Sequence, residues 1–234
     1  METITEHKID IDIDRVCKRL GYQARSPSAS ILTTVKSQIA RAYHLVKPAY
    51  LYEIKPIEYA HGDKLSLGES FVFTSKTVSH ALSDCEQTGI YVATVGNDIE
   101  KEMSRLVDHG QILEATVLDM IGSEAVNQVF CHFRDNIVEM ARDRGWQATI
   151  KYSPGYCDWH INQQRILFQI VDATPIGVSL NESCMMIPRK SVSGLIGMGK
   201  LDSTKQPPCI AVCDVRAHCT IKRDNWNPEK QWFL

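Results

Sequence analysis

Hydrophobic and polar residues alternate along this chain with two different periods. Apolar residues recur every three or four positions in five segments, which predicts helices at residues 13–22, 26–48, 98–110, 110–145 and 162–173. Short runs rich in β-branched and apolar residues predict strands at residues 49–59, 71–75, 89–96, 177–188 and 191–199. Together these segments predict one compact α+β unit, followed by a polar tail with little periodic structure.

The longest helical pattern covers residues 110–145 and is the expected spine of the core. Its apolar residues fall on one side at spacings of three or four, so one face of the helix is expected to be buried. Gly145 supplies the expected end of the helix. The apolar positions are Leu118, Ile121, Ala125, Val129, Phe133, Ile137 and Ala141.

Composition narrows the class of protein. The chain has 234 residues, of which 44% are hydrophobic and 23% charged, as in a globular protein with a sizeable core. Its formal net charge is -2 and its Lys and Arg residues form no cluster, which argues against nucleic-acid binding. No apolar run approaches the roughly 18 residues of a membrane-spanning helix, and the first residues lack a signal-peptide pattern. We therefore expect a cytoplasmic protein whose eight cysteines are reduced thiols or metal ligands.

The stretch KYSPGYCDWH, residues 151–160, has neither helical nor strand periodicity. Its Ser-Pro-Gly-Tyr core fits a type II turn, because Pro presets the first central φ and Gly supplies the positive φ of the second. Such a turn is common loop punctuation. It also brings backbone groups close to a ligand when a cation and a ring flank it, as Lys151 and Tyr156 do here.

Two motifs together identify a family. KYSPGYCDWH followed by LNESCMMIPRKSVSG resembles the activation domain of cobalamin-dependent methionine synthase and its stand-alone relatives. Those proteins carry Arg-x-x-Pro-Gly-Tyr and then L-x-E-S-x-x-M-x-P-x-x-S-V-S-G, and the specific resemblance covers residues 111–199. The matching residues are Pro154, Gly155, Tyr156, Leu180, Glu182, Ser183, Met186, Pro188, Ser191, Val192, Ser193 and Gly194.

The resemblance implies a fold and a ligand. It implies a C-shaped single α+β domain over residues 1–205, built on a twisted antiparallel sheet flanked by helices, that binds S-adenosylmethionine (AdoMet). In the family the arginine of the turn holds the AdoMet carboxylate, the turn backbone contacts the ligand and the tyrosine packs beside it. Lys151 stands where the family has that arginine, so it supplies a point charge without a planar fork. The implied binding residues in the turn are Lys151, Tyr152, Ser153, Gly155 and Tyr156.

Two further residues complete the expected site. Asn127 occupies the long helix where the family has a glutamate facing the ligand, and Glu182 belongs to the second motif. For Glu182 the alternative is a solvated acid or a partner of Arg189. We also expect Tyr156 and residues 191–194 to border a flat surface on which a partner docks.

The tail, residues 206–234, carries a second possible chemistry. Cys209, Cys213 and Cys219 lie within eleven residues, a spacing that suits an iron-sulfur cluster or a zinc ion with a fourth ligand from elsewhere. The alternative is a tail of free thiols.

Two function classes remain open. In the first, the resemblance implies reductive reactivation: AdoMet donates its methyl group to cob(I)alamin on a partner, after a low-potential electron donor has reduced the corrinoid. The partner would be a corrinoid-binding protein such as a truncated methionine synthase, because this chain has no D-x-H-x-x-G element for cobalamin. In the second, the chain is a non-catalytic corrinoid-protein-binding or electron-transfer module that has lost AdoMet binding.

Overall fold

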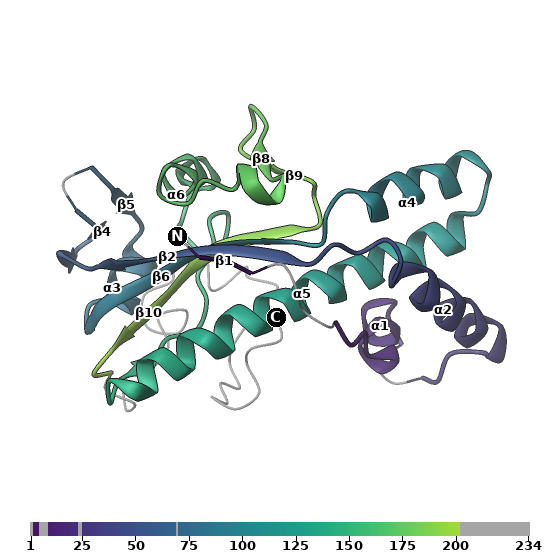
Figure 1. Ribbon diagram of the computed structural model, residues 1–234, viewed down its shortest axis with the longest axis horizontal. Helices are drawn as coiled ribbons and strands as arrows, with labels where there is room; N and C mark the ends of the chain where they lie inside the picture. Colours follow the sequence, from purple (N-terminus) through teal and green to yellow (C-terminus); the bar gives the residue numbers. More distant parts are fainter. Residues whose placement is uncertain (1, 5–8, 23–24, 69, 202–234) are drawn as a thin grey trace.

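A five-stranded antiparallel sheet forms the centre of the protein. The computed structural model describes residues 2–4, 9–22, 25–68 and 70–201. The sheet has the strand order β1-β2-β6-β10-β7, and Figure 1 shows its strands crossing the long helix α5. These strands are β1 (Glu2–Ile4), β2 (Ala49–Pro56), β6 (Cys85–Thr94), β7 (Gln147–Ala148) and β10 (Ser191–Gly199).

Helices cover both faces of the sheet. Helix α5 lies along one face and extends beyond the sheet to meet α1, α2 and α4, whereas α6 and the β8–β9 hairpin lie on the other face (Figure 1). The helices are α1 (Ile13–Arg19), α2 (Ala29–Ala42), α3 (Lys76–Ala81), α4 (Asp98–Asp108), α5 (Ile112–Asp143) and α6 (Gln164–Ile170). Two short 3-10 turns cover Ile161–Gln163 and Thr174–Ile176. The remaining strands are β3 (Tyr59–His61), β4 (Lys64–Ser66), β5 (Val72–Thr74), β8 (Ser179–Leu180) and β9 (Met186–Ile187).

The predicted α+β class is confirmed, and each segment predicted as helix or strand contains one. Elements that were not predicted, including α3, β3 and β4, have six residues or fewer, too few for a period to show. The N-cap of α1 is Asp12, whose carboxylate accepts hydrogen bonds from the backbone N–H groups of Asp14 and Arg15, so the helix starts at the first residue of the predicted segment.

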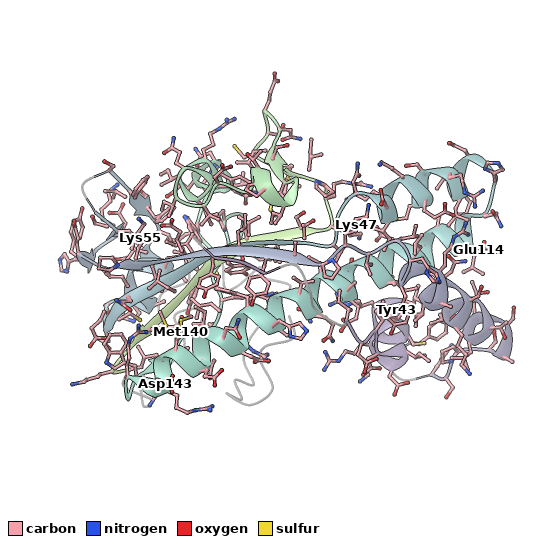
Figure 2. All side chains as sticks on the ribbon, viewed as in Figure 1. Tyr43, Lys47, Lys55, Glu114, Met140 and Asp143 are labelled. Carbon is pink, nitrogen blue, oxygen red and sulfur yellow. The ribbon has the colours of Figure 1, made fainter. Side chains whose placement is uncertain are left out.

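Two apolar cores share the central sheet, because side chains alternate between the faces of a strand. From β6, Tyr91 and Ala93 face the core that includes α5, while Ile90 and Val92 face the core that includes α3 and α6. Helix α5 spans the first core, with Glu114 near one end and Met140 and Asp143 at the other (Figure 2); its 32 residues make it about 48 Å long at 1.5 Å per residue. All seven of its predicted core positions are buried.

Residues 191–194 lie inside the sheet, so the expectation that they border a docking surface is wrong. Ser191 and Ser193 are buried, and strand β10 runs between β6 and the segment that leads from β7 to Tyr152. The backbone of Tyr152 exchanges both hydrogen bonds with Leu195, at 2.9 and 2.8 Å. A Cβ atom on Gly194 would overlap the carbonyl oxygen of Tyr152 and lie 2.9 Å from Ser153 Oγ. Gly194 therefore allows a close approach of two backbones.

Replacing Gly194 by alanine tests this packing. We expect Gly194→Ala to lower the free energy of unfolding by about 3 kcal/mol, because the added methyl group meets a hydrogen-bonded backbone carbonyl that cannot move alone. Gly122→Ala in α5 is the control: its Cβ would meet the side-chain ends of Ile99 and Lys190 at 3.1 and 3.2 Å, which can shift. Its effect should stay within about 1 kcal/mol. Urea unfolding measures the free energy of unfolding of both variants. Equal decreases in the two variants would contradict the close approach at Gly194.

Candidate functional site

The Ser-Pro-Gly-Tyr segment forms the predicted turn. Gly155 has a φ of 91°, and the backbone N–H of Tyr156 donates to the carbonyl of Ser153 at 3.3 Å. These are the positive central φ and the closing hydrogen bond of a type II turn. The N–H of Gly155 donates to the carbonyl of Trp159 at 2.7 Å, so the chain folds back on itself after the turn.

The residues after the turn anchor it to the α3 layer. The carboxylate of Asp158 accepts hydrogen bonds from Ser75 Oγ at 2.6 Å, Lys76 N at 2.7 Å and Thr77 N at 3.3 Å, which caps the first turn of α3. Partial burial tends to raise the pKa of Asp158, but these hydrogen bonds outweigh it and hold the pKa below its ordinary value. Trp159 is buried and packs edge-on against Phe73, with 5.3 Å between ring centroids.

The residues before the turn contact the opposite layer. The ammonium nitrogen of Lys151 lies 4.4 Å from the ring centroid of Phe130 on α5, a cation–π contact. The ring of Tyr91 on β6 is completely buried, stacks on Phe133 at 4.5 Å and lies 5.4 Å from Phe130. Burial raises the pKa of the Tyr91 phenol, and Ser153 and Tyr156 are among the groups near enough to affect it. The turn therefore lies beside an aromatic wall formed by β6 and α5.

Asn127 is one helical turn before Phe130 on α5. Asn127 is only 7% exposed, and its side-chain Nδ2 has no hydrogen-bond partner among the described residues. A buried amide donor without an acceptor costs about 1–3 kcal/mol. The site next to Lys151 thus offers a cation and an unused donor, which together suit a group rich in acceptor oxygens and negatively charged.

The expected site residues do not all come together. Residues 151–156 form one segment that contacts α5 through Lys151, with Tyr152 buried, Ser153 half-buried and Tyr156 58% exposed, and Asn127 is buried on α5 one helical turn before Phe130. Glu182 is exposed in the β8–β9 connection, on the other side of the sheet from α5 (Figure 1). The backbone carbonyl of Glu182 accepts a hydrogen bond from Arg165 Nη2 at 2.7 Å. Arg189, the alternative partner of the Glu182 carboxylate, pairs with Glu100, with 3.6 Å between Arg189 Nε and Glu100 Oε2.

Comparison with known proteins identifies the family. The family described as vitamin B12 dependent methionine synthase, activation domain, matches residues 78–203, more than half of the chain. The chain belongs to this family. The resemblance drawn from the two motifs is therefore confirmed, and the match contains both motifs, β6, α5 and β10. None of the curated proteins matches the chain.

A solved structure of this kind shares the fold. The structure described as "Crystal Structure of the MetH Reactivation Domain bound to AdoHcy" superposes with a TM-score of 0.58 at 12% sequence identity. The likeness covers 88% of this chain and 80% of that chain. At this identity it establishes a common fold, an activation-domain α+β architecture.

Two residues beside the turn were not predicted from the sequence: Phe130, which contacts Lys151, and Tyr91, which lies beside Phe130. The period of α5 places Phe130 on its buried face, so the helical pattern of residues 110–145 could have indicated it. Tyr91 carries no sequence signal of its own, because its contacts join segments far apart in the chain.

The predicted metal ligands Cys209, Cys213 and Cys219 lie outside the described residues, as does the predicted boundary of the tail at residue 206. Within the described residues, no group of three or more His, Cys, Asp or Glu side chains is arranged to hold a metal ion. Among the cysteines described there, Cys17, Cys85, Cys131 and Cys184 are free, buried thiols. In the same part of the chain, no helix has the length and apolar character needed to cross a membrane.

The cap formed by Asp158 gives a stability prediction. Asp158→Ala should lower the free energy of unfolding by about 1–2 kcal/mol at neutral pH, because α3 loses acceptors for its first N–H groups. The pKa of Asp158 is lowered on folding, so its contribution is present above the unfolded pKa and is lost as pH falls through the folded pKa.

The difference between wild type and Asp158→Ala should therefore narrow below about pH 4, near the ordinary value for an aspartate. Denaturant unfolding over a pH series measures it. Asp108→Ala, which removes an exposed carboxylate at the end of α4, is the control and should change stability by less than about 0.5 kcal/mol. A pH-independent difference at Asp158 would show that the cap does not act through the carboxylate.

Proposed function

We propose that this protein reactivates a corrinoid protein by binding AdoMet and presenting its methyl group to cob(I)alamin on the partner. One observation carries the proposal: Asn127 has a buried, unpartnered donor one helical turn before Phe130, the ring that Lys151 contacts just before the Pro-Gly-Tyr turn of an activation-domain fold. The solved relative in the same fold is bound to AdoHcy, the product of AdoMet after methyl transfer.

The groups near the turn match the carboxylate and the sulfonium of AdoMet. Lys151 supplies a positive charge for the ligand carboxylate, and Asn127 supplies a donor for one of its oxygens. Backbone groups of residues 153–155 border the ligand because the turn there is formed by Pro and Gly. The exposed ring of Tyr156 offers a face for the sulfonium, as aromatic faces attract cations.

The reaction needs positioning rather than acid–base catalysis. A low-potential electron donor gives one electron to the partner's cob(II)alamin, and the resulting cob(I)alamin attacks the methyl carbon of AdoMet. A cobalt–carbon bond forms as the carbon–sulfur bond breaks, and S-adenosylhomocysteine leaves as a neutral thioether. No proton moves in this step, so the site requires no general base, and its contribution is to hold the methyl group within reach of the corrinoid.

The corrinoid is expected on a partner protein, such as a truncated cobalamin-dependent methionine synthase or another corrinoid-binding methyltransferase component. Tyr156 is more than half exposed, so the outer side of the turn is accessible to a large planar substrate. Ser191 and Ser193 are buried and therefore not accessible to such a substrate. The docking surface thus involves the turn rather than strand β10.

The second candidate is a binding or electron-transfer module without AdoMet. It is favoured by two departures from the family: Asn127 replaces a glutamate, and Lys151 replaces an arginine. Lys cannot form the two parallel hydrogen bonds that a guanidinium makes with a carboxylate. The two candidates differ in whether AdoMet is consumed.

The assay combines the protein, AdoMet, a low-potential reductant and a cob(II)alamin-loaded corrinoid protein, and follows methylcobalamin formation by absorbance. We expect AdoMet-dependent methylcobalamin. Lys151→Ala should weaken AdoMet binding by roughly 1.5–3 kcal/mol, measured by calorimetric titration, because a charge-assisted contact is lost. Lys200→Ala, in an exposed residue after β10, is the control. Tight partner binding without methylcobalamin under any reductant would support the module instead.

The tail gives a separate prediction. We propose that Cys209, Cys213 and Cys219 hold iron or zinc, because three closely spaced thiolates favour soft or borderline metals. Anaerobically purified protein should contain about one metal site per chain. The triple Cys→Ser variant should lose this metal, and Cys157→Ser, which alters a thiol of the turn, should keep it. Metal analysis that finds only traces in wild type would leave a free-thiol tail.

A further inference from the structure

The hydroxyl group of Tyr91 is a buried polar group that the packing of the core does not use. Tyr91 lies within β6 and is completely buried, and its OH has no hydrogen-bond partner in the part of the chain that the structure describes. A buried hydroxyl without a partner is destabilising, whereas a phenylalanine would fill almost the same space without that cost. Packing alone therefore does not account for a tyrosine at this position.

Aromatic neighbours hold the Tyr91 ring in one place. The ring stacks on Phe133 of α5 with 4.5 Å between centroids, and it lies 5.4 Å from Phe130 of the same helix. On β2, Tyr52 is paired directly with Tyr91 and packs against Phe133 at 5.6 Å. A ring enclosed in this way keeps one rotamer, so its hydroxyl cannot turn towards another partner.

On the β10 side of Tyr91, the nearest polar side chain comes from the turn. Gly194 is paired directly with Tyr91 and has no side chain. Ser153 takes up this space, because its Oγ lies only 2.9 Å from the position that a Cβ atom on Gly194 would occupy. Paired residues point to the same face of a sheet, with Cβ positions about 4.5–5.5 Å apart. The turn therefore meets Tyr91 on the face of the sheet that α5 covers.

Tyr91 is a hydrogen-bond donor at physiological pH. Burial raises the pKa of its phenol above the ordinary value, and the nearby Ser153 hydroxyl acts in the opposite direction without reversing the shift. The phenol therefore keeps its proton, which it can donate to an acceptor. Ser153 does not serve as that acceptor, since no hydrogen bond joins the two hydroxyl groups.

We infer that Tyr91 is a further ligand-binding residue, whose hydroxyl donates a hydrogen bond to an acceptor group of the bound AdoMet on the side of the turn where Ser153 lies. This inference rests on the proposed function, since it concerns the same ligand beside the same turn. It adds strand β6 to a site otherwise formed by α5 and the turn. The donor is unpaired in the free protein, and the ligand supplies its acceptor.

Replacing Tyr91 by phenylalanine tests the inference, because Tyr91→Phe keeps the ring and removes only the hydroxyl. We expect calorimetric titration to show that this variant binds S-adenosylhomocysteine about tenfold to a hundredfold more weakly than wild type. Without ligand, its melting temperature should equal or exceed that of wild type, because an unpaired buried hydroxyl has been removed.

Tyr50→Phe is the matched control. Tyr50 is also completely buried and lies 5.9 Å from Phe133, but its OH accepts a hydrogen bond from Asn136 Nδ2 at 2.6 Å. Removing this hydroxyl should lower the melting temperature by about 2–4 °C and leave the affinity for S-adenosylhomocysteine within about twofold of wild type. The control should thus lose stability and keep affinity, whereas Tyr91→Phe should keep stability and lose affinity.

The outcomes separate the inference from the proposed function. If wild type binds neither S-adenosylhomocysteine nor AdoMet, the proposed function fails and the inference with it. If wild type binds and Tyr91→Phe binds equally well, only the inference fails. A lower melting temperature of Tyr91→Phe without ligand would show that the hydroxyl is already satisfied in the free protein, for example by water, and would overturn the inference. Equal losses of affinity in Tyr91→Phe and Tyr50→Phe would overturn it as well, because the aromatic cluster would then act only through its packing.

Discussion

The close approach of the Tyr152 backbone to Gly194 determines where the turn starts and which layers Lys151 and Tyr152 face. Tyr152 and Leu195 exchange two backbone hydrogen bonds, and this bridge fixes the position along β10 at which the chain leaves the sheet and enters the turn. The bridge forms only because Gly194 has no Cβ to meet the Tyr152 carbonyl. Strand alternation then sends Lys151 toward α5 and Tyr152 toward the opposite core, so the turn starts with one side chain in each layer.

The turn gains rigidity because both layers hold it. On one side, Asp158 caps α3 and Trp159 packs against Phe73; on the other, Lys151 contacts Phe130. A binding loop is usually the least constrained part of a domain, whereas this one is fixed at both ends by buried or charge-assisted contacts. Ligand binding to a preorganised turn loses less conformational entropy, which fits the proposal that the site presents a methyl group in one geometry.

How far the sequence predicts this structure depends on the range of each interaction. The buried face of α5 follows from a period within one segment, and the turn follows from the φ preferences of Pro154 and Gly155. Contacts that join distant segments leave no such pattern: Asp158 meets Lys76 across 82 residues, and Arg15 meets Glu124 across 109.

The misplacement of residues 191–194 has a different physical cause. The expectation followed from how a partner would approach the turn, but here Gly194 lets an inner strand pack closely on the Tyr152 backbone. Ser191 Oγ is satisfied internally by the carbonyl of Pro188 at 2.7 Å, so its polarity requires no water. The neighbours that cover this strand come from distant segments, which the local sequence does not show.

The free-energy cost of burying Asn127 with an unpaired donor helps to distinguish the two candidate functions. A buried amide whose donor has no acceptor is destabilising, and an apolar residue of similar size at the same place in α5 would cost nothing of the kind. A module with no ligand beside α5 would gain stability from that replacement. In a protein that binds a carboxylate there, the same amide forms a hydrogen bond in the bound state, and its cost in the free state becomes part of the preference for ligand. Together with the contact between the Lys151 ammonium and Phe130, this cost fits the proposed AdoMet-binding reactivator better than the module, with α5 contributing to the proposed site as well as the turn.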